Sequence, residues 1–160
     1  MGLRPPPLYY TSFLCLIPSF YGQGTLVGKL YTVITALSIL NHGKSHEEYI
    51  GKDLVVGADR VVVHFTGLLL TIESLKLMDY SATIGYAVGF QLCLLYAVLN
   101  YHVVQRHLTR TGASVDILKW LHASFHVVSV IGGMLILHGL KVRKRLTQNL
   151  TCAPSNISSL

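Results

Sequence analysis

The feature that most constrains this chain is a series of four long apolar segments. They cover residues 24–42, 54–73, 81–101 and 117–140. A helix needs roughly 20 mostly apolar residues to cross the hydrocarbon core of a membrane, and each segment is close to that length. Because the bilayer core offers no water to unpaired backbone groups, segments that span it singly are helical. We therefore predict an all-α fold, a polytopic transmembrane helical bundle.

The composition agrees with a membrane protein. Of the 160 residues, 51% are hydrophobic and only 12% are charged, whereas about 25% of a typical soluble domain is charged. This balance excludes intrinsic disorder and leaves too few charges to cover a soluble surface. The net charge of +6 does not indicate nucleic acid, because a block of the positive residues follows the last apolar segment. We expect membrane lipid as the partner and no nucleic acid.

A fifth segment, residues 8–22, is shorter and is interrupted by Pro18. It either spans the membrane poorly, lies at the interface or acts as a signal-like segment. The prediction is thus four to five spans. The domain organisation is an N-terminal segment over 1–23, a transmembrane bundle over 24–140 and a polar basic tail over 141–160, with loops at 43–53 and 102–116.

The distribution of Lys and Arg predicts the orientation of the bundle, since cytoplasmic loops carry the excess of positive charge. A cytoplasmic tail places seven basic residues inside and four outside, namely Arg4, Lys29, Lys76, Lys141, Arg143, Lys144 and Arg145 against Lys44, Lys52, Arg106 and Arg110. We therefore expect a multi-pass protein of the plasma membrane or an endomembrane with a cytoplasmic C-terminal tail.

Polar residues inside the spans indicate a site, because ionisable groups are costly in hydrocarbon and tend to face the bundle interior. Ser38 and His42 lie one helical turn apart, as do His122 and His126. Asp59 lies near the start of the second span. Because successive spans alternate in direction, these five residues are all expected at one membrane face.

Three histidines at one depth can bind zinc and leave a fourth position for water. We predict His42, His122 and His126 as zinc ligands, with Asp59 orienting or deprotonating the water and Ser38 stabilising an oxyanion. Each residue also has a simpler interpretation. The histidines can be hydrogen-bonding groups between helices, Ser38 a packing residue, and Asp59 a helix-start carboxylate or an ion-pair partner.

This order of residues resembles the CREST superfamily, which includes alkaline ceramidases, progestin and AdipoQ receptors and hemolysin III-type proteins. His122-Ala-Ser-Phe-His126 with Gly132 is similar to the H-x3-H-x5-G run of that superfamily, and Ser38-Ile-Leu-Asn-His42 resembles its S-x3-H run. The resemblance implies a zinc ion held by the three histidines, with Ser38 and Asp59 at the water.

Two departures from the superfamily pattern are evident. The superfamily has seven spans, whereas this chain has room for four or five. Between the Asp span and the H-x3-H span the family has three helices and this chain has one, and both numbers are odd. The last span therefore still enters from the same face. The carboxylate is also ambiguous, since Asp53 is an alternative to Asp59.

Three functions follow from these observations. The first is a zinc-dependent, ceramidase-like membrane hydrolase that acts on a lipid amide or ester, with a water on the metal as nucleophile. The second is a non-catalytic, receptor-like or scaffold protein of the same superfamily. The third is a haem-binding membrane redox subunit, in which paired histidines from two helices ligate iron; the candidates are His64, His102, His122, His126 and His138. A smaller bundle can also form a homo-oligomer to complete its wall.

Overall fold

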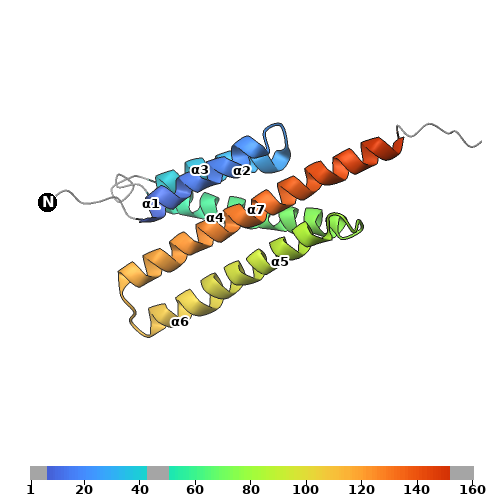
Figure 1. Cartoon of the computed structure of the whole chain (residues 1–160). Helices are drawn as coiled ribbons and strands as arrows, with labels where there is room; N and C mark the ends of the chain where they lie inside the picture. The colour runs from blue at the N-terminus through green and yellow to red at the C-terminus, as the bar shows by residue number, and fades with distance from the viewer. Residues whose placement is uncertain (1–6, 43–50, 152–160) are drawn as a thin grey trace, which may run out of the picture.

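The computed structural model describes residues 7–42 and 51–151, and within these ranges the chain is helical and contains no strand. The described elements are α1 (Pro7–Ser12), η1 (Phe13–Cys15), α2 (Leu16–Tyr21), α3 (Leu26–His42), α4 (Lys52–Leu77), α5 (Ile84–Val98), η3 (Leu99–Val104), α6 (Gln105–Arg110) and α7 (Val115–Thr151). The all-α prediction is therefore confirmed for these residues. Figure 1 shows α7 running past α1 and α2 on one side and α5 and α6 on the other.

Within the described residues, three helices are long and apolar enough to cross a membrane: Asp53–Leu77, Ile84–Arg110 and Val115–Asn149. The predicted span at 24–42 corresponds to α3, which has 17 residues and falls short of the roughly 20 that a bilayer requires. Large apolar side chains on α4 and α5 point outward, including Leu54, Val61 and Leu92, which are 77%, 68% and 63% exposed. Such outward apolar faces are compatible with contact to lipid.

The predicted loop at 102–116 is wrong over most of its length. The helix of α5 continues through the π-helical stretch η3 and α6 as far as Arg110. Neither glycine nor proline occurs between Gly89 and Gly112, and Gly112 turns the chain with a φ of 75°, a conformation that favours glycine. The turn before α7 is thus only a few residues long.

The predicted tail at 141–160 also begins as a helix. The last apolar segment ends at Leu140, but α7 continues to Thr151. Residues 140–151 contain neither glycine nor proline, so the helix can extend beyond its apolar part. Lys141 lies within this extension, where its Nζ donates a hydrogen bond to the Tyr21 carbonyl oxygen at 2.9 Å.

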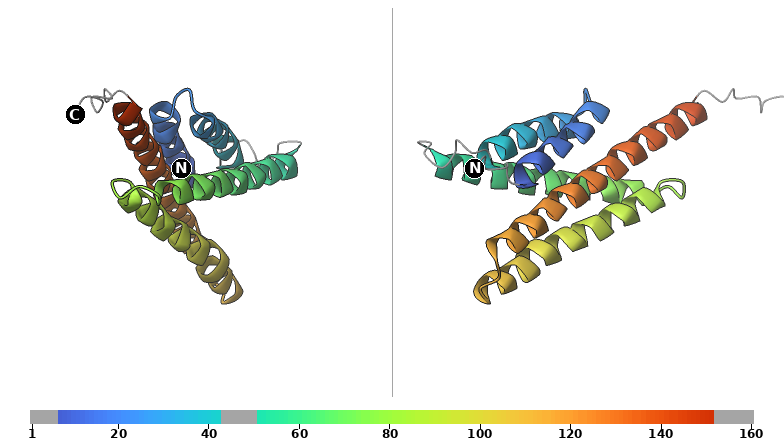
Figure 2. Two further views of the ribbon diagram at one scale, coloured as in Figure 1. Left: turned by 90° about the vertical axis from the view of Figure 1, so that its right-hand side faces the viewer. Right: turned by 60° about the vertical axis from the view of Figure 1, so that its left-hand side comes forward.

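The N-terminal segment forms three short helical pieces, α1, η1 and α2, that lie against α3 and α7. Figure 2 shows the segment running beside α3 from two further directions. Between α2 and α3 the chain turns at Gly24, whose φ is 85°. Thr25 Oγ1 then accepts a hydrogen bond from the Gly28 N–H at 3.0 Å, which caps the start of α3.

The core draws its buried side chains mainly from α3, α4, α5 and α7, and small residues on α7 permit close contact there. A Cβ atom at Gly132 would lie 3.2 Å from Cβ of Cys93, and one at Gly133 would collide with the ring of Tyr31. Tyr31 is 3% exposed, and its hydroxyl donates to the Ser129 carbonyl oxygen at 2.9 Å. The glycine pair therefore serves close helix packing, as its sequence predicts.

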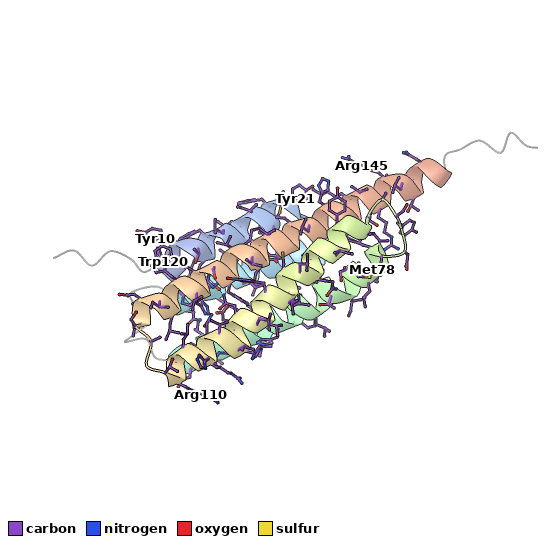
Figure 3. The ribbon with its side chains drawn as sticks, turned by 60° about the horizontal axis from the view of Figure 1, so that its bottom comes forward. Tyr10, Tyr21, Met78, Arg110, Trp120 and Arg145 are labelled. Atoms are coloured by element: carbon purple, nitrogen blue, oxygen red, sulfur yellow. The ribbon has the colours of Figure 1, made fainter. Side chains whose placement is uncertain are left out.

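Exposed aromatic residues mark one end of the bundle. Figure 3 places Tyr10 and Trp120 together at the end where α1 and α7 begin, with Tyr21 and Arg145 toward the other end. Tyr10 is 57% and Trp120 is 67% exposed. Aromatic side chains of this kind are common at the level of lipid headgroups.

Candidate metal centre

Three histidines meet at the end of the bundle where α3 ends and α7 begins. His42 is the last residue of α3, whereas His122 and His126 lie one turn apart on α7. One nitrogen of each imidazole lies within 4.8 Å of the others. The ring centroids form an almost equilateral triangle, with separations of 5.4, 5.4 and 5.1 Å. The three residues could therefore hold a metal ion together.

The donor set fits zinc, which binds neutral imidazole nitrogen in tetrahedral sites. Zinc–nitrogen bonds of about 2.0–2.1 Å place tetrahedral donors roughly 3.3 Å apart. This separation lies within the 4.8 Å limit that contains all three donor atoms here. His126 is buried, with 7% of its surface exposed, and an ionisable side chain inside a span marks a candidate functional site.

A hydrogen-bonded carboxylate belongs to the same cavity. Oδ1 of Asp59 accepts a hydrogen bond from the Ser38 hydroxyl at 3.1 Å. Its Oδ2 accepts one from Nδ2 of Asn41 at 2.9 Å. Asp59 is 8% and Ser38 is 3% exposed. Both carboxylate oxygens are thus held in place by neutral donors from α3.

The histidines and the carboxylate line one cavity of about 500 Å³. Along α4 its wall runs from Val56 to Thr71, a length of about 22 Å at 1.5 Å per residue. Away from the polar end, the wall consists mainly of apolar side chains, among them Ile34, Val63 and Leu94. The cavity therefore joins a polar, potentially metal-binding end to an elongated apolar part.

Aromatic and hydroxyl side chains surround the histidines. The ring of Phe125 lies 5.9 Å from that of His122, and the ring of Tyr101 lies 6.3 Å away. On the other side, Oγ1 of Thr11 lies 3.1 Å from Nδ1 of His126. Thus α1, α5–η3 and α7 all contribute to the immediate surroundings of the cluster.

The structure brings all five predicted site residues together and separates the two candidate carboxylates. Asp59 lines the cavity, whereas Asp53 lies on the first turn of α4, is exposed and does not line it. Asp59 forms no ion pair with Arg60 in the described structure, where the ion pairs of acidic residues are Glu73–Lys76 and Asp116–Lys119. The partners of Asp59 are therefore Ser38 and Asn41.

The other described histidines do not belong to the three-histidine cluster. His64 and His102 line the same cavity, although both are exposed. His138 lies farther along α7, where its Nδ1 is 2.7 Å from the Tyr21 hydroxyl. The structure therefore places His138 apart from the cluster.

Two polar neighbours of the site were not predicted from the sequence. Asn41 lies three residues after Ser38, so its helical spacing could have shown that both face α4. Thr11 lies in a segment more than 100 residues from His126 along the chain. Nothing in the local sequence of Thr11 indicates that contact, which depends on how α1 packs against α7.

In comparisons with known proteins, no family model, no curated protein and no solved structure matches the chain.

Proposed function

We propose that this protein is a zinc-dependent integral-membrane hydrolase that cleaves an amide or ester bond of a membrane lipid. The observation that carries the proposal is the position of the three-histidine triangle beside a hydrogen-bonded Ser–Asp pair in one elongated, largely apolar cavity. The order of these residues resembles that of the CREST superfamily, to which we assign the chain as part of the proposal. In the proposed topology α3 is a fourth span and the α1–α2 segment is a short fifth span.

His42, His122 and His126 would hold the zinc ion. When bound, zinc supplies a Lewis acid that polarises a carbonyl and makes water acidic enough to lose a proton near neutral pH. Neutral imidazoles are the appropriate donors for such an ion. With three protein ligands, the site would have the coordination typical of catalytic rather than structural zinc.

Asp59 and Ser38 would carry out the proton transfer and charge stabilisation. Asp59, positioned by Ser38 and Asn41, would accept a proton from water as the water oxygen bonds to the lipid carbonyl carbon. That proton would pass to the nitrogen or oxygen of the leaving group as its bond to the carbonyl carbon breaks. Ser38 would turn its hydroxyl toward the carbonyl oxygen as negative charge develops there.

The apolar part of the cavity supports a lipid substrate. Ile34, Leu70 and Phe90 line it, and each is less than 9% exposed. A hydrocarbon chain in contact with these side chains would place a neighbouring amide or ester near the polar end. Burial of apolar surface would supply binding free energy at about 25 cal/mol per Å².

A non-catalytic role is the second candidate, and one observation favours it. His42 lies on α3 and the other two histidines on α7, so a metal ion would cross-link these helices. A receptor-like or scaffold protein could retain the ion for stability alone. Zinc binding without hydrolysis of any lipid amide or ester would favour this function.

Metal content and turnover, measured together, test the proposal. We expect about one zinc per chain in detergent-purified protein, as measured by elemental analysis, and hydrolysis of a panel of lipid amides and esters. His122→Ala/His126→Ala should lose both. His107→Ala is the matched control because His107 is exposed and lies outside the cavity, so it should retain both. A folded wild type without zinc would refute the proposal.

A further inference from the structure

We propose that Thr11 is a positioning residue that determines which ring nitrogen His126 presents to the metal ion. The proposal rests on the metal site of the proposed function and adds to it a residue from the N-terminal segment. In this assignment α1 completes the site by holding the His126 ring in one tautomer. The argument depends on the two hydrogen bonds of a single hydroxyl group.

Oγ1 of Thr11 has two polar neighbours. It lies 3.1 Å from Nδ1 of His126 and donates to the Leu8 carbonyl oxygen at 3.2 Å. A hydroxyl group has one proton to donate, and a carbonyl oxygen can only accept. Both contacts can be hydrogen bonds at the same time only if the Thr11 hydroxyl donates to Leu8 and the imidazole donates its Nδ1–H to Thr11.

A neutral imidazole that carries its proton on Nδ1 has its lone pair on Nε2. The hydrogen bond to Thr11 therefore leaves Nε2 available as the metal ligand. Metal-binding histidines almost always donate the other ring N–H to a nearby acceptor, which fixes both tautomer and ring orientation. In this chain the acceptor would be a threonine hydroxyl, not a carboxylate.

The position of Thr11 is itself well determined. The neighbouring Ser12 is fully buried and donates to the same Leu8 carbonyl oxygen at 2.8 Å. The helix α1 contacts both α7 and α3, the two helices that carry the histidines. The packing of α1 against these two helices therefore fixes the position of the Thr11 hydroxyl.

Conservative substitutions at Thr11 test the proposal. Thr11→Val keeps the shape but removes the acceptor, whereas Thr11→Ser keeps the acceptor. We expect Thr11→Val to weaken zinc affinity by about 10–100-fold, the usual effect of losing such a partner. Thr11→Ser should stay within a few-fold of the wild type. Zinc affinity is measured by competition with a chromophoric chelator, and Co²⁺ absorption spectra report the ligand geometry.

Thr35→Val is the matched control for this substitution. Thr35 is buried and donates to the Tyr31 carbonyl oxygen at 2.8 Å, but it does not line the cavity. It should alter neither zinc affinity nor the Co²⁺ spectrum. Equal zinc affinity of Thr11→Val and the wild type would refute the role of Thr11 while leaving the metal site intact. A wild type that binds no zinc would refute both proposals.

A measurement on the wild-type protein avoids dependence on how the variants fold. In metal-free protein with ¹⁵N-labelled histidine, at a pH where the ring is neutral, the chemical shifts of His126 distinguish the two tautomers. We expect protonated Nδ1 and unprotonated Nε2, with His126→Ala identifying the signals. The opposite tautomer would overturn the proposal.

Discussion

At the scale of single residues, the hydrogen bonds around Asp59 distinguish two roles that a carboxylate can have near a metal ion, namely metal ligand and general base. Its oxygens accept hydrogen bonds from Ser38 and Asn41. Asp59 is thus held beside the three histidines but is not one of the candidate metal ligands. A carboxylate held in this way can act as a base. The proposed metal affinity and the proposed chemistry should therefore respond differently when its charge is removed.

Asp59→Asn tests this separation directly. The amide keeps the size of the side chain but cannot accept a proton, so we expect hydrolysis to fall by about 10²–10⁴-fold, the usual contribution of a general base. Zinc content should stay near the wild-type value. Steady-state turnover and elemental analysis on the same preparations measure the two effects.

Asp53→Asn is the control for the loss of one negative charge on α4. Asp53 is exposed on the first helical turn, so its substitution should leave turnover and zinc content unchanged. A larger loss of turnover in Asp53→Asn than in Asp59→Asn would assign the base to the other carboxylate.

At the scale of helices, the side of α7 that carries glycine determines how closely the bundle packs. The ring of Tyr31 lies over Gly133, and its hydroxyl donates to the carbonyl oxygen of Ser129 one turn earlier. This contact fixes α3 against α7 within the same bundle that carries His42, His122 and His126. Close packing at the glycine thus contributes to holding the histidines at one place.

Gly133→Ala should destabilise the bundle. The added Cβ would lie 2.6 Å from Cζ of Tyr31, which requires the ring or the helix to move. Overpacking of this kind typically costs about 1–3 kcal/mol. Thermal unfolding in detergent should show a lower midpoint, and zinc affinity should fall as the helices separate.

Gly85→Ala is the matched control on α5, where an added Cβ meets no heavy atom within 4 Å. Because alanine is the better helix former, its unfolding midpoint should be unchanged or slightly higher. Equal effects of the two substitutions would show that the contact with Tyr31 has no influence on stability.

At the scale of the whole molecule, the orientation of α7 relates the site to the two sides of a membrane. The histidines lie near its start, and its last turns carry basic residues, including Lys141 and Arg145. Positive residues favour the cytoplasmic side. We therefore expect the candidate metal centre near the opposite face, with the chain after α7 in the cytoplasm.

Cysteine labelling tests this orientation, because Cys152 follows α7 in the sequence and Thr111 precedes it. In a Cys15→Ala/Cys93→Ala background, we expect Cys152 to react with a membrane-impermeant maleimide only from the cytoplasmic side. Thr111→Cys/Cys152→Ala should react only from the other side. Labelling of both positions from one side would show that α7 does not cross the membrane, and the reverse pattern would invert the topology. Asn149 and Asn156 each begin an N-x-[ST] sequon, so a glycan at either residue would also invert the topology.

The amino-acid sequence predicts the helical class and the residues of the candidate site. Uninterrupted apolar segments specify helices because a backbone in hydrocarbon must satisfy its own hydrogen bonds. The spacing of Ser38 from His42 and of His122 from His126 places each pair on one helix face. Alternation of span direction then predicts that both pairs and Asp59 share one end of the bundle, where the structure brings them together.

Other features are visible only in the folded chain. The choice of Asp59 over Asp53 as the cavity carboxylate depends on which face of α4 meets α3. The contact of Thr11 with His126 joins residues 115 positions apart, and no local pattern encodes it. The extensions of helix to Arg110 and Thr151 were missed because polar sequence was interpreted as loop, although polar residues without glycine or proline can continue a helix. The choice of carboxylate and the contact of Thr11 arise from packing between distant segments, which the periodicity of one segment does not contain.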